Sequence, residues 1–327
     1  MSSFLSLILK FSRPTSCILR PAVFFSSTAT LFDDALKTSR ELVRTMLKER
    51  GFTGNLNITS SAFNKNDLRA LKVSLEPTHK CDVLPCGIKV TSFFEKYTLP
   101  QIDIQTLRDQ EFDVDSLKEI TDNQVKVFLT DLHEVIKNLG DDEGTEEAVT
   151  DTLVNNLLVQ IAGMHYHPLR VRTHPRCKLY ILGEPYVSAT PKFVVNRMNL
   201  SVVVVEDKHL KNTALITSKG FGEAQLAVEM LACGSENVRR ILRQGDVISD
   251  QTIFGIRAIS SYFTFYKTVI PAEYWNELDF SLPQNESVVI KRWPEGELPE
   301  TGLNLAKPNE RREILEAFAR IRQFLLQ

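Results

Sequence analysis

Residues 202–208 read Val-Val-Val-Val-Glu-Asp-Lys, and this stretch decides the predicted fold. Four consecutive β-branched residues predict a strand that is buried on both faces of a sheet. Charged residues follow where this strand ends. Because Glu206 and Lys208 lie two positions apart, their side chains point to the same face, and Asp207 points to the other. We therefore expect the strand to place a carboxylate and an ammonium group on one side of its sheet.

The elements on either side of this strand predict an α/β core. A helix begins near Thr145, and short strands, a second helix and further strands follow it along the chain. This order is typical of one mixed sheet that lies between helices. The elements expected after the first helix are strands at 178–182, 193–196 and 200–205, a helix at 221–233, strands at 252–259, 262–270 and 287–291, and a closing helix at 308–326.

The first half of the chain predicts a helical and mixed region. Apolar residues at helical spacing favour an amphipathic helix over residues 31–51. Residues 99–151 hold fifteen Asp or Glu against four Lys or Arg, which indicates an acidic helical layer. The acidic, glycine-containing loop at 140–144 suggests a boundary between a region at 31–140 and a domain at 141–327.

The N-terminus has the composition of a targeting segment. Residues 1–32 contain three basic residues, seven Ser and no acidic residue. This pattern predicts a mitochondrial transit peptide over residues 1–30 and delivery to the matrix. A secretory signal is less favoured, because Lys10 follows the apolar run instead of preceding it. The remaining alternative is an N-terminal segment that carries no targeting signal. No apolar run reaches the roughly 20 residues that a membrane-spanning helix needs.

Composition excludes several classes of protein. The chain of 327 residues is 43% hydrophobic and 24% charged, which rules out collagen-like and disordered proteins. A formal net charge of -2 excludes a polycation that coats nucleic acid, so any basic surface is local. The five cysteines are odd in number and irregularly spaced, and they predict a reducing compartment in preference to a disulfide scaffold.

Glu206 and Lys208 form a candidate catalytic pair. A carboxylate binds Mg²⁺ through oxygen, and a neighbouring ammonium group can orient a water molecule and offset negative charge on a phosphate. The alternative is an ordinary strand end that enters solvent, where charged residues are common.

The order of elements and the Glu-x-Lys motif, followed by a helix with Gln225, resemble the PD-(D/E)XK nuclease superfamily and its restriction-endonuclease-like fold. The segments 203–208, 222–226 and 250–255 also look like nuclease-like domains of uncharacterised fungal proteins. The resemblance covers about residues 145–270. It implies that Glu206 binds Mg²⁺, that Lys208 assists the attacking water, and that Glu147 or its neighbour Glu146 supports the metal. It also places Gln225 near the path of the phosphate.

The sequence departs from the superfamily at one important position. The expected Pro-Asp step, on the strand before the Glu-x-Lys strand, reads Pro191-Lys192. Because an ammonium group cannot coordinate Mg²⁺ and repels it, this change predicts a degenerate nuclease that binds its substrate without cutting it.

A basic strip precedes the Glu-x-Lys strand. Between Met164 and Leu200 the chain has six Lys or Arg residues and one acidic residue, Glu184. Arginine and lysine contacts to phosphate provide affinity that does not depend on base sequence. The alternative is that the strip pairs with the acidic layer at 99–151. The strip residues predicted to contact nucleic acid are Arg170, Arg172 and Lys192, together with Gln225 from the later helix.

The sequence thus predicts a mitochondrial protein that binds nucleic acid on a nuclease-like domain. In the catalytic version of this hypothesis, the domain carries out metal-dependent phosphodiester hydrolysis. Its catalytic residues are Glu206, Lys208 and Glu147, and its Mg²⁺ ligands are Glu206 and Glu147. A non-catalytic protein-interaction module, which keeps the nuclease scaffold for packing alone, is the alternative.

Overall fold

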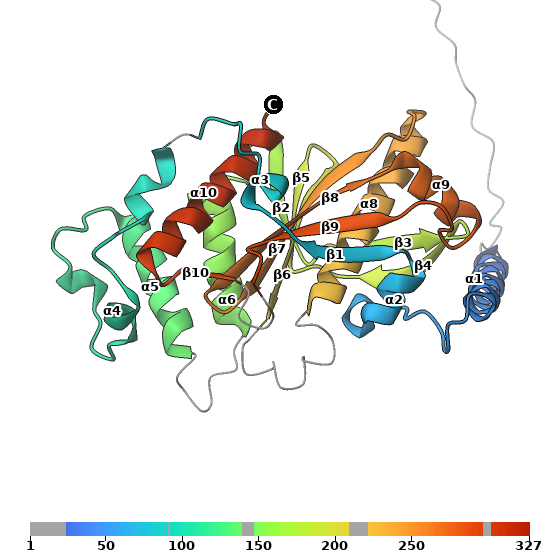
Figure 1. Ribbon diagram of the computed structural model, residues 1–327, viewed down its shortest axis with the longest axis horizontal. Helices are drawn as coiled ribbons and strands as arrows, with labels where there is room; N and C mark the ends of the chain where they lie inside the picture. Colours follow the sequence, from blue (N-terminus) through green and yellow to red (C-terminus); the bar gives the residue numbers. More distant parts are fainter. Residues whose placement is uncertain (1–23, 91, 139–146, 209–221, 297–301) are drawn as a thin grey trace, which may run out of the picture.

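One eight-stranded mixed sheet flanked by helices forms the body of the protein in this computed structural model (Figure 1). The structure describes residues 24–90, 92–138, 147–208, 222–296 and 302–327. The strands lie in the order β1 (Val73–Pro77), β9 (Val288–Trp293), β8 (Tyr262–Ile270), β7 (Gln251–Ile259), β6 (Leu200–Lys208), β5 (Phe193–Arg197) and β2 (Leu169–Thr173), and β10 (Leu303–Asn304) pairs with β8.

Strand β6 lies inside the sheet, as its valine run predicts. It pairs in parallel with β7 and antiparallel with β5. Strands β1 and β9 are also parallel, and the remaining neighbours in the sheet are antiparallel. The predicted α/β class with a mixed sheet is therefore confirmed.

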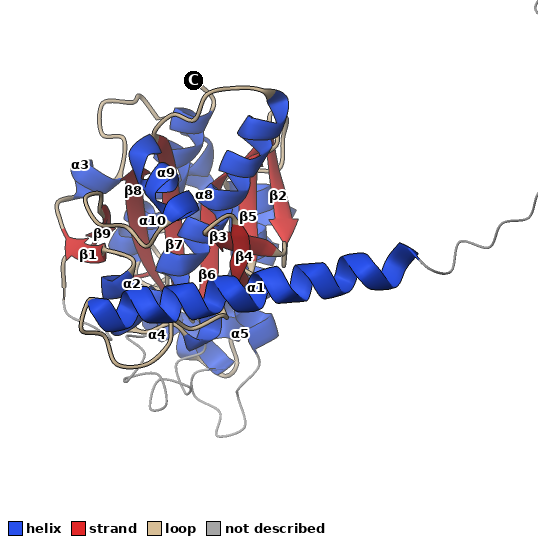
Figure 2. Cartoon of the chain, turned by 90° about the vertical axis from the view of Figure 1, so that its right-hand side faces the viewer, coloured by secondary structure: helices blue, strands red, loops and turns tan. Residues whose placement is uncertain are grey.

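Helices cover both faces of this sheet (Figure 1). We call one face the α6 face; its helices are α5 (Asn123–Asn138), α6 (Glu147–Asn156) with a π-helical turn at Leu157–Ile161, and α10 (Pro308–Leu325). The other is the α8 face; it carries α8 (Glu223–Gln244), α9 (Ala272–Phe280), α2 (Lys65–Ala70), α1 (Phe24–Glu49) and a separate hairpin of β3 (Cys177–Ile181) and β4 (Glu184–Ala189). Figure 2 shows α1 lying across this side, with its first half extending beyond the body. Two short helices, α3 (Lys80–Val83) and α4 (Ile104–Arg108), lie in the connections.

Each face of the sheet has its own hydrophobic core. Val203 and Val205 of β6 belong to the core under α6, whereas Val204 belongs to the core under α8. Since side chains alternate along a strand, Glu206 continues toward α8 and Asp207 continues toward α6. This alternation determines which partners each carboxylate can reach.

The sheet and one core both extend across residue 140, where the sequence suggests a domain boundary. Strand β1, from the first half of the chain, pairs with β9 near its end. Helix α5 shares its core with α6 and α10. The buried side chain of Arg311 on α10 also donates hydrogen bonds to the carbonyl oxygens of Thr98, Leu99 and Ile102, at 2.9–3.1 Å. The two halves of the chain are therefore packed as parts of one sheet and one core.

Two other expectations concern the cysteines and membranes. Cys81 and Cys86 form a disulfide, which is not what a reducing compartment predicts, while the buried Cys177 and Cys233 are free thiols. None of the helices in the described part of the chain is long and apolar enough to cross a membrane. Residues 1–23 of the predicted targeting segment lie outside the described residues.

Candidate functional site

Glu206 lies in a buried polar cluster on the α8 face, at the carboxyl end of β6. The side chain of Gln225 donates hydrogen bonds from Nε2 to Glu206 Oε1, at 2.6 Å, and to Glu229 Oε1, at 3.0 Å. Gln225 and Glu229 lie four residues apart on α8, so they face the same strand end. Ser60 Oγ also donates to Glu229 Oε1, at 3.0 Å. We call these four residues the Glu206 cluster.

Burial controls the ionisation of this cluster. Glu229 is fully buried, and burial together with the nearby negative charge of Glu206 raises the pKa of Glu229 well above its ordinary value. Burial disfavours the charged form, and a like charge does the same. Burial and the neighbouring charge of Glu206 therefore favour the protonated form of Glu229.

Further polar residues extend the same face across the sheet. Glu223, in the first turn of α8, accepts hydrogen bonds from Tyr266 OH at 2.8 Å and from Arg292 Nη1 at 3.1 Å. Arg257 on β7 lies beside Glu206 in the sheet register, and its Nη2 donates to Thr264 Oγ1 at 3.2 Å. Glu223 thus joins α8 to β8 and β9, and Arg257 joins β7 to β8.

Lys192 forms a second cluster, on the α6 face. Its ammonium nitrogen lies 3.1 Å from a carboxylate oxygen of Glu147, 3.2 Å from one of Asp151 and 3.6 Å from one of Asp207. Helix α6 provides Glu147 and Asp151 one turn apart, and β6 provides Asp207. We call these four residues the Lys192 cluster. The lysine that replaces the expected Asp of the nuclease motif is thus the centre of a three-carboxylate ion cluster.

The charges of the Lys192 cluster shift one another's pKa. Burial, and then the hydrogen bond and negative charge of Asp151, raise the pKa of Asp207 to about 9. Burial raises the pKa of Asp151. The hydrogen bond with Asp207 and the charge of Lys192 outweigh this effect and hold the pKa of Asp151 below its ordinary value. Burial lowers the pKa of Lys192. The charge of Asp207 and the contact with Glu147 outweigh this effect and raise the pKa of Lys192. Asp207 is therefore protonated at neutral pH, while Lys192 stays charged.

The structure does not bring Glu147 and Glu206 together. Glu147 contacts Lys192 on the α6 face, and Glu206 contacts Gln225 on the α8 face. The sheet separates them, so they cannot bind the same Mg²⁺ ion as the resemblance implies. The backbone of Lys208 pairs with Ile259 at the end of β6, and its side chain lies outside the described residues, as does Glu146.

The residues of the two clusters do not fit the implied Mg²⁺ site. In the Lys192 cluster the carboxylates already surround an ammonium group. In the Glu206 cluster, burial raises the pKa of Glu229 and so disfavours the carboxylate form that would bind a metal ion. Among the residues that the structure describes, no three His, Cys, Asp or Glu side chains are grouped so that they could hold a metal ion.

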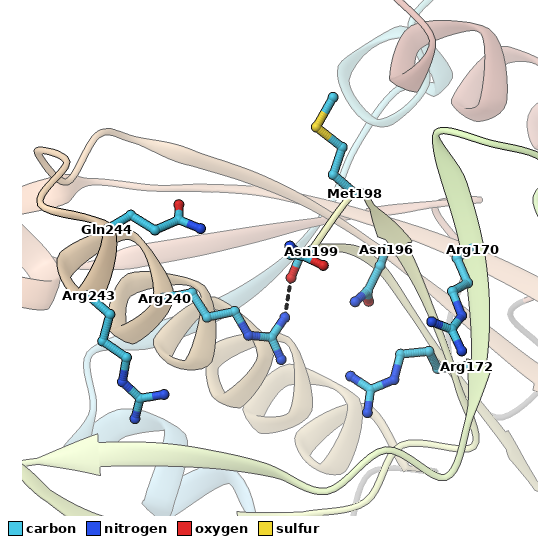
Figure 3. Close-up of a pocket in the computed structure, with 8 residues that line it drawn as sticks. All are labelled: Arg170, Arg172, Asn196, Met198, Asn199, Arg240, Arg243 and Gln244. Carbon is cyan, nitrogen blue, oxygen red and sulfur yellow. Dashed lines mark hydrogen bonds between the residues drawn. The ribbon is translucent and has the colours of Figure 1, made fainter. Parts of the chain in front are cut away.

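A basic groove lies at the opposite end of β6. It is a cavity of about 490 Å³, lined by Arg170, Arg172, Asn196, Met198, Asn199, Arg240, Arg243 and Gln244 (Figure 3). None of these eight residues is acidic. Arg240 donates a hydrogen bond to the backbone oxygen of Asn199, which fixes one guanidinium group beside the β5–β6 turn. We call this cavity the arginine groove.

Two distant elements form the arginine groove. Arg170 and Arg172 lie two positions apart on β2, so their side chains point to the same side of the strand. Arg240 and Arg243 lie three residues apart near the end of α8, and therefore share a helix face. A second cavity of about 450 Å³ also contains Arg170 and Arg172, and is bordered by Asn155, Val159 and His165.

The structure places the predicted nucleic-acid-binding residues in three locations. Arg170 and Arg172 line the arginine groove, Lys192 is in its ion cluster, and Gln225 binds the two buried carboxyl groups. Sequence reasoning missed Arg240 and Arg243. Their signal is the Arg-Arg-x-x-Arg pattern at 239–243, which lies beyond the predicted end of the helix at residue 233 but within α8, because the helix continues to Gln244. It also missed Glu223 and Glu229, two acidic residues within that helix.

The β5–β6 turn of the arginine groove and the Glu206 cluster lie at opposite ends of β6. Asn199 of the groove immediately precedes β6, and Glu206 lies six residues after the first residue of the strand, Leu200. At about 3.3 Å per residue, these two ends of β6 are about 20 Å apart.

No protein-family model matches the chain, and a search of curated proteins finds no match. The groove and the two clusters are therefore the basis for a functional proposal.

Proposed function

We propose that the protein binds nucleic acid in the arginine groove and does not hydrolyse it. The observation that supports this function is the groove itself, in which four guanidinium groups from β2 and α8 line one cavity together with no acidic side chain. Guanidinium groups match phosphate oxygens in charge and in planar geometry. A phosphate backbone is the ligand chemistry that this arrangement fits best.

The positions of the carboxylates favour binding without cleavage. Glu206 lies about 20 Å along β6 from Leu200, the first residue of the strand, and it does not line the groove. The residues expected to support catalysis are occupied by Lys192 on one face and by Gln225 on the other. The residues that line the groove therefore include no carboxylate that could assist hydrolysis.

Fluorescence anisotropy with the full chain tests this proposal. Labelled DNA and RNA of about 20 nucleotides are titrated at 50 and 200 mM salt, with the wild type and with Arg240→Gln plus Arg243→Gln. We expect Kd to rise about tenfold or more in the variant. The slope of log K against log salt becomes shallower by about 0.9 for each lost phosphate contact to duplex DNA.

A charge-matched variant provides the control. Arg108→Gln plus Arg312→Gln removes two exposed arginines outside the groove and has the same change of net charge. If this variant loses affinity as much as the groove variant, or if the wild type binds no nucleic acid, the proposal is wrong and the protein-interaction module replaces it.

The same samples, incubated with Mg²⁺ or Mn²⁺ and run on denaturing gels, test the second half of the proposal. We expect the oligonucleotides to stay intact. Cleavage that disappears in Glu206→Gln would show that the protein is an active nuclease.

A further inference from the structure

We propose that the arginine groove selects single-stranded nucleic acid, with phosphates inside the groove and bases at its rim. This inference rests on the proposed function. It concerns which form of the polymer binds, and it comes from the position of the groove in the sheet and from the side chains at its opening.

The groove lies along the edge of the sheet. Strand β2 is the last strand in the sheet order, and β5 is its neighbour in that order. Arg170 and Arg172 line cavities of about 490 and 450 Å³, so the two cavities meet at this strand. Together they form a basic path that passes from α6 to the end of α8. A flexible single strand can follow such a path around the edge of the sheet, whereas a double helix resists bending over so short a span.

The rim of the groove is apolar and exposed. Met198 is 69% exposed and Tyr166 is 64% exposed. The backbone connects them at the start of β2, because Met198 N donates to Pro168 O at 2.8 Å and Leu169 N donates to Tyr166 O at 2.9 Å. Figure 3 shows Met198 pointing away from the guanidinium groups. Positive charge therefore lies inside the groove, the thioether of Met198 lies at its edge, and the exposed ring of Tyr166 lies beyond that edge, near Gly163.

This division matches the chemistry of an unpaired strand. A single strand presents a charged backbone and free base faces at the same time, and every base can stack on an aromatic side chain. In a duplex the bases are stacked on one another, so Tyr166 and Met198 have no base face to contact. The arginines therefore provide binding, and the two rim residues provide the preference for single strands.

Anisotropy with four probes tests this inference. The probes are 12-nucleotide oligo-dT and oligo-rU, and a DNA and an RNA hairpin with the same number of phosphates. We expect oligo-dT or oligo-rU to bind at least tenfold more tightly than the matching hairpin. The stronger of the two shows whether DNA or RNA is preferred.

Variants at the rim separate this inference from the proposed function. We expect Tyr166→Ala to weaken single-strand binding about tenfold, with hairpin binding and the salt slope unchanged, and Tyr166→Phe to retain binding. The control is Phe280→Ala plus Val127→Ala, which removes two exposed apolar side chains on α9 and α5. Circular dichroism establishes that each variant is folded.

The outcomes are distinguishable. Equal affinity for hairpins and single strands, or unchanged single-strand binding in the rim variant, overturns the inference, while the groove arginines can still be required for both probes. Absence of binding to all four probes overturns both proposals.

Discussion

The two ends of strand β6 carry opposite charges in opposite environments. At its amino end, four arginines surround a cavity that is open to solvent. At its carboxyl end, Glu206 and Asp207 are 1% and 0% exposed and are surrounded by partners on separate faces. The difference teaches that a charge can bind a ligand only where its neighbours leave it available. The Glu-Asp-Lys motif at 206–208 is the most conspicuous charged motif of the sequence. It lies at the end of β6 where Glu206 and Asp207 already have partners within the protein.

The energetics of the two ends differ for the same reason. A buried ion cluster is costly to break, because the remaining charges keep their desolvation penalty. Exposed arginines keep their hydration when a neighbour is removed. We therefore expect substitutions at the carboxyl end to change stability, and substitutions at the amino end to change binding.

Removal of the Lys192 ammonium group has the largest expected effect on stability. Lys192→Met leaves three neighbouring carboxyl groups without their shared cation, and we expect the free energy of unfolding at pH 7 to fall by about 3 kcal/mol. Urea unfolding measures the change. Lys126→Met, which breaks an exposed ion pair with Asp115, is the control, with an expected loss below about 1 kcal/mol. Similar losses of stability in both variants would contradict the proposed difference between the two ends of β6. Weaker oligonucleotide binding in Lys192→Met would also contradict it.

Asp207→Asn has an effect on stability that depends on pH. The pKa of Asp207 is about 9 in the folded protein, above the value of about 3.9 in an unfolded chain, so the folded state retains a proton that the unfolded state releases. This carboxyl group therefore makes the protein less stable as pH rises from about 4 to about 9. Asparagine removes that dependence. We expect the variant to gain stability over the wild type by about 1 kcal/mol per pH unit between pH 5 and 8.

Urea unfolding at several pH values measures this gain. Asp115→Asn makes the same chemical change at an exposed site of the same chain and serves as the control. Parallel stability curves for Asp207→Asn and the wild type would show that Asp207 does not carry the extra proton.

Substitution in the arginine groove has the smallest expected effect on stability. Arg240→Gln plus Arg243→Gln removes exposed charges and one hydrogen bond to Asn199, and we expect the free energy of unfolding to change by about 0.5 kcal/mol or less. The same variant loses oligonucleotide binding. A large loss of stability here would mean that the groove is part of the folded framework and not a surface reserved for a ligand.

Local patterns in the sequence predict most of the sheet. The valine run predicts β6, and alternation correctly places Glu206 and Asp207 on opposite faces. Strands β5, β7, β8 and β9 begin or end within a few residues of their predicted bounds. Strand β2 was missed because its Leu-Arg-Val-Arg-Thr sequence lies between prolines and has only two apolar residues.

The site could not be predicted to the same extent, because it depends on packing between distant elements. Spacing within β6 relates Glu206 to Lys208, but it does not tell which face of the sheet α6 covers. Glu147 was therefore expected beside Glu206 and instead contacts Lys192. The arginine groove joins β2 to the end of α8, some 70 residues later in the sequence, and no local pattern relates Arg170 to Arg240.

The parallel pairing of β1 with β9 has a consequence for the order of folding. Val73 lies opposite Val288, so β1 must wait for more than two hundred further residues to be synthesised before it can pair. Contacts between residues so far apart in sequence form slowly, because a long loop must close first. During translation the first half of this chain therefore stays without its sheet partner, and its exposed strand is a natural site for a chaperone to bind.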